Sequence, residues 1–196
     1  SGIRTQVECM QAKEIKITDI EGLRIGQAEN AAAAAEAVLH SSVADEVRCH
    51  IAEGLGNARL CARMEKVPGL PVVIDGTHTV AGMELLCRDV ARLYGRTVTV
   101  FGVLDDKDAD GLAHLVSQVS ERIIVTQPAS DRALPADRLS DIVGRYADAE
   151  RIVPLEDALD RAVETAGGRT ILITGSFRMA EGAIKWLRTR YVRSLT

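Results

Sequence analysis

The chain has 196 residues, enough for one good-sized domain or for one domain and part of another, and a hydrophobic content of 46% suffices for an ordinary core. Its formal charge of −4 comes from 28 acidic and 24 basic residues spread along the chain, so no basic stripe indicates a nucleic-acid partner. No apolar run reaches the roughly 18 residues that cross a bilayer, and the N-terminus lacks a signal-peptide pattern, so we expect a cytoplasmic protein with no membrane partner.

The N-terminal part of the chain predicts a short helical lead-in. Glu14–Ile20 alternates polar and apolar residues as a half-buried strand does. Asn30 is then expected to cap an alanine-rich helix that runs to about His40, and Ser42 to cap a second helix, with Asp45 at capping-box spacing. Both helices would carry apolar faces that need a partner surface, so we predict that the chain self-associates.

From Met64 onward, apolar strands alternate with helical segments. Strands are predicted at Met64–Val67, Val72–Ile74, Thr97–Val103, Arg122–Val125, Arg151–Val153 and Thr170–Thr174. Helices are predicted at Val80–Leu93, Ala109–Val119, Ala136–Tyr146, Glu156–Ala166 and Arg178–Arg190. Such alternation indicates a parallel sheet covered on both faces. The predicted fold class is therefore α/β, with a Rossmann-like, mainly parallel six-stranded sheet, helices on both of its faces, and the short helical lead-in before it.

Pro71–Gly82 is the most informative segment of the chain. It predicts a buried strand, a polar turn that carries Asp75 and His78, and the start of a helix with Thr79 as N-cap. Ligands of open α/β sheets bind outside the carboxyl ends of the strands, so Asp75 and His78 are the first functional candidates. On the residues alone, the alternative is that Asp75 only caps the helix and that His78 is an exposed turn residue.

Polar residues follow other predicted strands as well. Asp105–Asp108, with Lys107 at its third position, follows one strand, and Gly175–Phe177 follows the last one. Carboxylates suit ribose hydroxyls or a magnesium shell, lysine suits phosphate, and a Gly-Ser turn at a helix start offers backbone N–H groups to an anion. The acidic segment could equally be a solvated, charge-balanced turn.

Several common motifs are missing from the chain. There is no Gly-x-x-x-x-Gly-Lys-[Ser/Thr] phosphate loop and no Gly-x-Ser-x-Gly elbow, so neither P-loop nucleotide binding nor a complete hydrolase is expected. Gly54–Arg59 resembles a dinucleotide fingerprint but follows a helix instead of a strand, which opposes a Rossmann-like oxidoreductase. The four scattered cysteines favour thiols of a reducing compartment over a disulfide or metal role.

Five segments stand in an order and spacing typical of one family: Ala62-Arg63, Asp75–Thr79, Asp106–Asp108, Asp131–Ala133 and Gly175–Phe177. Together they resemble the C-terminal domain of the Mur ligase superfamily, most closely the folylpolyglutamate synthase and dihydrofolate synthase branch. Departures from the family pattern are Thr79-Val80 in place of Asn-Pro, and Ala62 and Asp131 in place of Gly and Pro.

The resemblance implies an ATP-dependent ligase that phosphorylates a substrate carboxylate and lets the amino group of glutamate attack the acyl phosphate. ATP and Mg²⁺ would be the cofactors. Residues 1–62 would be a remnant of the central ATPase domain, with one strand and two helices, and residues 63–196 the C-terminal α/β domain. The partner would be a P-loop ATPase domain, in the same chain or in a separate subunit, which holds most of the metal shell.

The resemblance also implies residue roles. Arg63 would reach the γ-phosphate, Asp75 would hold the ribose, and His78 would lie beside the nucleotide. An arginine delivered by domain closure neutralises charge in phosphoryl transfer, and closure excludes water from a hydrolysable intermediate.

The remaining implied roles concern catalysis and the incoming amino acid. Lys107 would join Arg63 and His78 as a catalytic candidate by adding positive charge, and Ser176 and Phe177 would bind the substrate. The alternative function is a non-catalytic module that kept the fold and binds a nucleotide or a partner protein.

Overall fold

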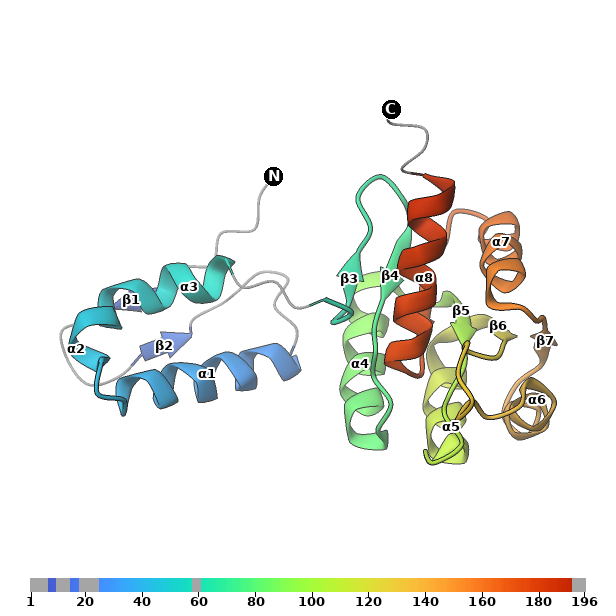
Figure 1. The fold of residues 1–196 in the computed structure, drawn as a ribbon, viewed down its shortest axis with the longest axis horizontal. Coiled ribbons are helices and arrows are strands. Elements are labelled where there is room, and N and C mark those ends of the chain that lie inside the picture. Colours follow the sequence, from blue (N-terminus) through green and yellow to red (C-terminus); the bar gives the residue numbers. More distant parts are fainter. Residues whose placement is uncertain (1–6, 10–14, 18–24, 58–60, 192–196) are drawn as a thin grey trace. The chain divides into compact units, whose positions relative to one another are not determined.

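The computed structural model describes residues 7–9, 15–17, 25–57 and 61–191, and the chain divides into two compact units, residues 1–60 and residues 61–196 (Figure 1). In the first unit, β1 (Val7–Cys9) and β2 (Ile15–Ile17) pair antiparallel. The predicted strand Glu14–Ile20 contains β2, and its other residues lie outside the described ones. The sequence did not indicate β1, because a three-residue strand is too short to show periodicity.

The helices of the first unit differ from the predicted ones. They are α1 (Ile25–Leu39), α2 (Ala44–Val47), the 3-10 turn η1 (Arg48–His50) and α3 (Ile51–Asn57). Asn30 lies inside α1 and does not cap it, because the Gln-Ala-Glu residues before it are good helix formers that extend the helix. Ser42 does not cap the second helix either, since α2 starts after Val43 with no side-chain cap.

The second unit is built on a six-stranded sheet in the order β3-β4-β8-β5-β6-β7. The strands are β3 (Glu65–Lys66), β4 (Val72–Ile74), β5 (Thr97–Phe101), β6 (Ser120–Val125), β7 (Ala149–Arg151) and β8 (Ile171–Thr174). Only the edge strand β3 runs antiparallel to its neighbour. The strand β8, the last one among the described residues, lies in the middle of the sheet, between β4 and β5.

Helices cover both faces of this sheet. They are α4 (Val80–Tyr94), α5 (Ala109–Val119), α6 (Ala136–Val143), α7 (Leu155–Thr165) and α8 (Phe177–Arg190). Side chains of α4, α5 and α6 pack in one core cluster, and those of α7 and α8 pack in the other (Figure 1). Within β4, Val73 joins the first cluster while Val72 and Ile74 join the second, so alternate residues are buried on opposite faces. The predicted α/β fold class is confirmed.

Element ends differ from the predicted ones where tertiary pairing intervenes. β5 ends at Phe101 and not at Val103, because the chain leaves the sheet: Leu134 N donates to the Val103 carbonyl, and Leu104 forms an isolated bridge with Ala133. β7 lies two residues before its predicted position, since its register is set by pairing with β6 and not by apolar alternation. None of the described helices combines the length and apolar character needed to cross a membrane.

Candidate functional site

The sheet order brings the chain segments after β4, β8 and β5 to one edge, because these strands are parallel neighbours. Thr79 caps α4 as predicted, with its hydroxyl accepting a hydrogen bond from Gly82 N at 3.2 Å. Gly175 has φ +108°, and a Cβ there would lie 2.5 Å from the Gly102 carbonyl oxygen. The turn after β8 therefore requires glycine, because the turn after β5 lies directly against it.

Asp75 joins two segments of this edge and does not cap α4. The residue is buried, with 4% of its surface exposed. One carboxylate oxygen accepts a hydrogen bond from Met64 N at 2.7 Å, and the other accepts one from Thr77 N at 2.8 Å. The carboxylate thus ties its own turn to the loop that precedes β3.

That preceding loop carries Arg63 between two residues with unusual backbone conformation. Ala62 has φ +53° and Met64 has φ +47°, both in the left-handed region that non-glycine residues rarely adopt. The Ala62 carbonyl accepts a hydrogen bond from Gly76 N at 2.8 Å, and Ala62 N donates to the Glu65 carboxylate at 2.9 Å. Arg63 is therefore presented by a loop that is bonded on both sides.

Phe177, the first residue of α8, contacts the side chains of Arg63 and His78 with its ring. The Arg63 guanidinium carbon lies over this ring, 5.1 Å from its centroid, and the His78 ring centroid lies 5.5 Å from it. A Cβ on Gly76 would come within 2.5 Å of the Phe177 ring, so the ring rests on that backbone. Arg63, His78 and Phe177 thus form one group, named here the edge cluster, and Phe177 is 46% exposed.

His78 has a defined orientation within the edge cluster. Its Nδ1 lies 2.9 Å from the Gly76 carbonyl oxygen, which can only accept a hydrogen bond. Nδ1 therefore carries a proton and donates it to this carbonyl, and Nε2 is the other ring nitrogen. Nearby on α4, burial and then the charge of Asp75 raise the pKa of the Cys87 thiol to about 12, so this cysteine stays protonated.

Ser176 lies next to the edge cluster but is buried, at 1% exposure. Its hydroxyl accepts a hydrogen bond from Met179 N at 3.2 Å and caps α8. The structure therefore gives Ser176 a structural partner, whereas its predicted role in substrate binding stays a prediction.

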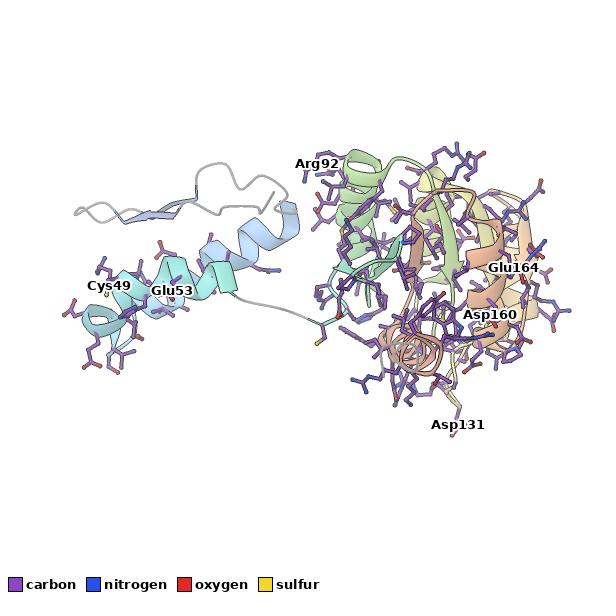
Figure 2. The ribbon with its side chains drawn as sticks, turned by 90° about the horizontal axis from the view of Figure 1, so that it is seen from above. Cys49, Glu53, Arg92, Asp131, Asp160 and Glu164 are labelled. Atoms are coloured by element: carbon purple, nitrogen blue, oxygen red, sulfur yellow. The ribbon has the colours of Figure 1, made fainter. Side chains whose placement is uncertain are left out.

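Lys107 belongs to a separate ionic network. Its Nζ lies 3.0 Å from an Asp106 carboxylate oxygen that also accepts a hydrogen bond from Arg132 Nη2 at 2.8 Å. The pKa of the Asp106 carboxyl lies below its usual range. The hydrogen bond from Lys107 is the largest cause, and the charge of Arg132 lowers this pKa further. The Asp106–Asp108 and Asp131–Ala133 segments thus contact each other, and Asp131 itself projects from the surface (Figure 2).

The structure therefore brings together Arg63, Asp75, His78 and Phe177, with Ser176 adjacent, and places Lys107 in the network with Asp106. Sequence reasoning did not single out Met64 or Gly76, although Gly76 next to Asp75 was a signal for close packing. Among the described residues, no three histidine, cysteine, aspartate or glutamate side chains gather as metal ligands. A shallow cavity of about 600 Å³ lies elsewhere, at the start of β6 and along β7, lined by Glu121, Arg122, Ile123, Asp148, Ala149, Glu150 and Arg161.

Comparison with known proteins supports the resemblance. The family model described as "Mur ligase, glutamate ligase domain" matches residues 62–177. A Halobacterium salinarum protein, named as a probable bifunctional folylpolyglutamate synthase/dihydropteroate synthase, is 33% identical over 181 residues, which are 88% of this chain and 22% of that protein.

Solved structures give the same picture. Mycobacterium tuberculosis folylpolyglutamate synthase, complexed with ADP and AMPPCP, matches with a TM-score of 0.63 and 29% identity over 71% of this chain and 34% of that chain. E. coli FolC in complex with DHPP and ADP matches in fold, with a TM-score of 0.69 and 23% identity over 82% of this chain and 39% of that one. This chain thus spans well under half of these relatives. Because the family match covers more than half of its residues, the chain belongs to the Mur ligase family, with folylpolyglutamate synthases as its relatives.

Proposed function

We propose that this chain is the C-terminal, nucleotide- and amino-acid-binding domain of an ATP-dependent ligase that adds glutamate to a folate-like carboxylate through an acyl phosphate. The observation that carries the proposal is the edge cluster, in which Arg63, His78 and Phe177 come from three separate family motifs and meet at the carboxyl edge of the sheet. The nucleotide complexes of the M. tuberculosis relative support a nucleotide as the ligand.

Arg63 and His78 of the edge cluster fit a nucleoside triphosphate. A guanidinium matches phosphate geometry, and the imidazole suits the polar edge of a base. Arg63 reaches the γ-phosphate in this proposal, His78 lies beside the nucleotide, and Asp75 lies at the ribose. Bound ATP would supply the phosphoryl group that activates the carboxylate.

The amino-acid side of the site is assigned to the start of α8. Phe177 contacts the incoming glutamate with its exposed edge, and Ser176 lies behind it. Lys107 adds positive charge at the same sheet edge, but its bond to Asp106 makes it the least direct of the assigned residues.

A second domain completes the proposed enzyme. The ligands for Mg²⁺ and the P-loop are assigned to an ATPase domain, in the same chain or in a separate subunit, and residues 1–62 are assigned to the end of that domain. Closure of residues 63–196 over it would deliver Arg63 to the phosphates and exclude water from the acyl phosphate.

Glutamate-dependent ADP release tests the proposal. The chain is assayed alone and then mixed with the separately produced P-loop domain from the same source, with a folate acceptor. We expect release only in the mixture, and Arg63→Ala should lower it at least about 100-fold by removing charge stabilisation in the transition state.

The matched control is Arg188→Ala, which removes an exposed arginine from the far end of α8 and should leave ADP release unchanged. Absence of release from a mixture that is shown to assemble would contradict a folate acceptor. A nucleotide bound by the chain without any turnover, with several carboxylated acceptors, would favour the non-catalytic module.

A further inference from the structure

The loop that carries Arg63 has a conformation that needs an explanation. Ala62 and Met64, on either side of Arg63, both have positive φ values. The left-handed conformation is unfavourable for residues other than glycine, and such strain persists only where surrounding contacts impose it. The contacts on this loop therefore reveal what holds Arg63.

Asp75 supplies the strongest of those contacts. Its carboxylate accepts a hydrogen bond from Met64 N at 2.7 Å, one residue after Arg63, while its other oxygen is anchored on Thr77 N at 2.8 Å. Hydrogen bonds to an ionised carboxylate are shorter and stronger than those between neutral groups. Because Asp75 is almost fully buried, water competes little for these bonds.

The guanidinium group of Arg63 is also held in place by a contact with another residue. The guanidinium lies over the Phe177 ring at 5.1 Å, and that ring is itself seated on Gly76, the residue after Asp75. Gly76 N also donates to the Ala62 carbonyl at 2.8 Å. Asp75 and Gly76 thus fix the backbone on both sides of Arg63, and Phe177 fixes the direction of its side chain.

We infer that Asp75 is a positioning residue for Arg63. By bonding the strained loop, Asp75 keeps the Arg63 guanidinium over the Phe177 ring before any ligand binds. The inference rests on the proposed function for the role of Arg63 at phosphate. It is separate from the ribose contact assigned to Asp75, and the two roles have different consequences.

The first test uses nuclear magnetic resonance of the chain without nucleotide. Protons of the Arg63 side chain over the Phe177 ring should be shifted upfield by its ring current, and Phe177→Leu identifies these signals by abolishing the shift. Asp75→Asn replaces one of the two accepting oxygens with an NH₂ donor. The amide side chain therefore cannot accept the hydrogen bonds of both Met64 N and Thr77 N as the carboxylate does. We expect this variant to lose at least about half of the upfield shift, as the guanidinium leaves the ring.

The matched control is Asp108→Asn, at the same sheet edge, where the carboxylate accepts a hydrogen bond from Gly111 N and caps α5. It should leave the Arg63 signals in place. An unchanged upfield shift in folded Asp75→Asn overturns the inference. Because no nucleotide is present, this outcome is independent of whether the proposed function holds.

A second measurement needs no variant. Hydrogen exchange of the Met64 amide in the unsubstituted chain should be at least about 100-fold slower than in an unstructured peptide if Asp75 holds it. Exchange at the unprotected rate overturns the inference.

Kinetics in the assembled ligase then separate positioning from ribose contact. Positioning predicts that Asp75→Asn lowers kcat in the wild-type background and has less than about a twofold effect in the Arg63→Ala background. Positioning alone leaves the preference for ATP over 2′,3′-dideoxy-ATP unchanged, whereas the ribose contact assigned to Asp75 predicts that the substitution removes this preference. An equal loss of kcat in both backgrounds overturns the inference.

Discussion

Gly76 shows how one residue without a side chain organises the edge cluster. A Cβ at this position would lie 2.5 Å and 2.7 Å from two Phe177 ring carbons, so the ring rests directly on the backbone. The same residue donates its N–H to Ala62 and offers its carbonyl to His78. Phe177 and His78 therefore contact Gly76 directly, and Arg63 is linked to it through Ala62 and through the Phe177 ring.

Gly76→Ala should consequently damage the site more than the fold. The half-exposed Phe177 ring can swing into solvent, so we expect the free energy of unfolding to change by less than about 1 kcal/mol. Glutamate-dependent ADP release in the mixture with the P-loop domain should fall about tenfold or more, because Arg63 and His78 lose their shared support. Thermal unfolding and the ADP assay measure the two effects.

Gly54→Ala is the comparison variant, since a Cβ there meets nothing within 4 Å. It lies in α3 and should leave ADP release unaltered while stabilising the helix slightly. Full ADP release by Gly76→Ala would show that the contact of the Phe177 ring with the Gly76 backbone is not needed for activity.

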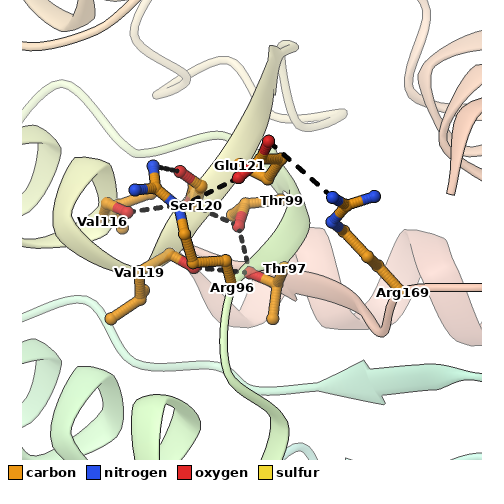
Figure 3. A network of polar contacts seen from close by, with 8 residues as sticks. All are labelled: Arg96, Thr97, Thr99, Val116, Val119, Ser120, Glu121 and Arg169. Atoms are coloured by element: carbon orange, nitrogen blue, oxygen red, sulfur yellow. Dashed lines mark hydrogen bonds and ion pairs between the residues drawn. The ribbon is translucent and has the colours of Figure 1, made fainter. Parts of the chain in front are cut away.

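At the level of elements, β5 and β6 are joined by a buried chain of hydroxyl groups near their amino ends (Figure 3). Thr97 and Thr99 hydroxyls lie 2.9 Å apart, Thr99 and Ser120 hydroxyls 2.6 Å apart, and Ser120 donates to the Val116 carbonyl at 2.7 Å. This edge of the sheet is opposite to the edge cluster. Its polar groups are paired internally, which indicates a structural role.

Thr99→Val should destabilise the second unit without affecting the site. The substitution keeps the shape of the side chain but removes the middle hydroxyl, and with it two buried hydrogen bonds, which corresponds to about 1 to 2 kcal/mol. Thr97 keeps an alternative acceptor in the Val119 carbonyl at 3.3 Å, so a larger loss is not expected. Urea unfolding measures the change.

Thr189→Val, which removes an exposed hydroxyl bonded to the Lys185 carbonyl at 3.0 Å, is the matched control and should change stability by less than about 0.5 kcal/mol. Equal stability of Thr99→Val and the unsubstituted chain would mean that the hydroxyl chain contributes nothing.

At the scale of the whole molecule, residues 1–60 form a compact unit of their own, whose helices carry apolar side chains. On their helices, Ala35 and Ile51 are buried, whereas Val38, Val47 and Leu55 stay partly exposed. A helical unit that leaves apolar side chains partly in water favours association with another surface.

We therefore predict that the chain self-associates and that a shortened chain of residues 61–196, which keeps both core clusters, is monomeric and folded. Sedimentation equilibrium at rising concentration measures the mass of each, and circular dichroism checks that the shortened chain is folded. A full chain that stays monomeric at high concentration contradicts the prediction.

The sequence by itself determined the α/β class, the residue motifs of the family and most element positions in the second unit. Apolar strands and amphipathic helices are local patterns, so α5 was predicted at its observed bounds and Thr79 at its observed cap. The predictions for the first unit are weaker, because an alanine-rich sequence gives no sharp helix start, and the prediction of Asn30 as a cap is wrong.

Only the tertiary structure decided which motifs meet. The position of β8 between β4 and β5 places Phe177 beside Gly76, although the two lie 101 positions apart in the chain, and no local pattern encodes that order. It also decided that Asp75 bonds the Met64 backbone and that Lys107 pairs with Asp106. Contacts between distant segments depend on strand order and register, which arise from the packing of the whole sheet. The chemical properties of each side chain, in contrast, follow directly from the sequence.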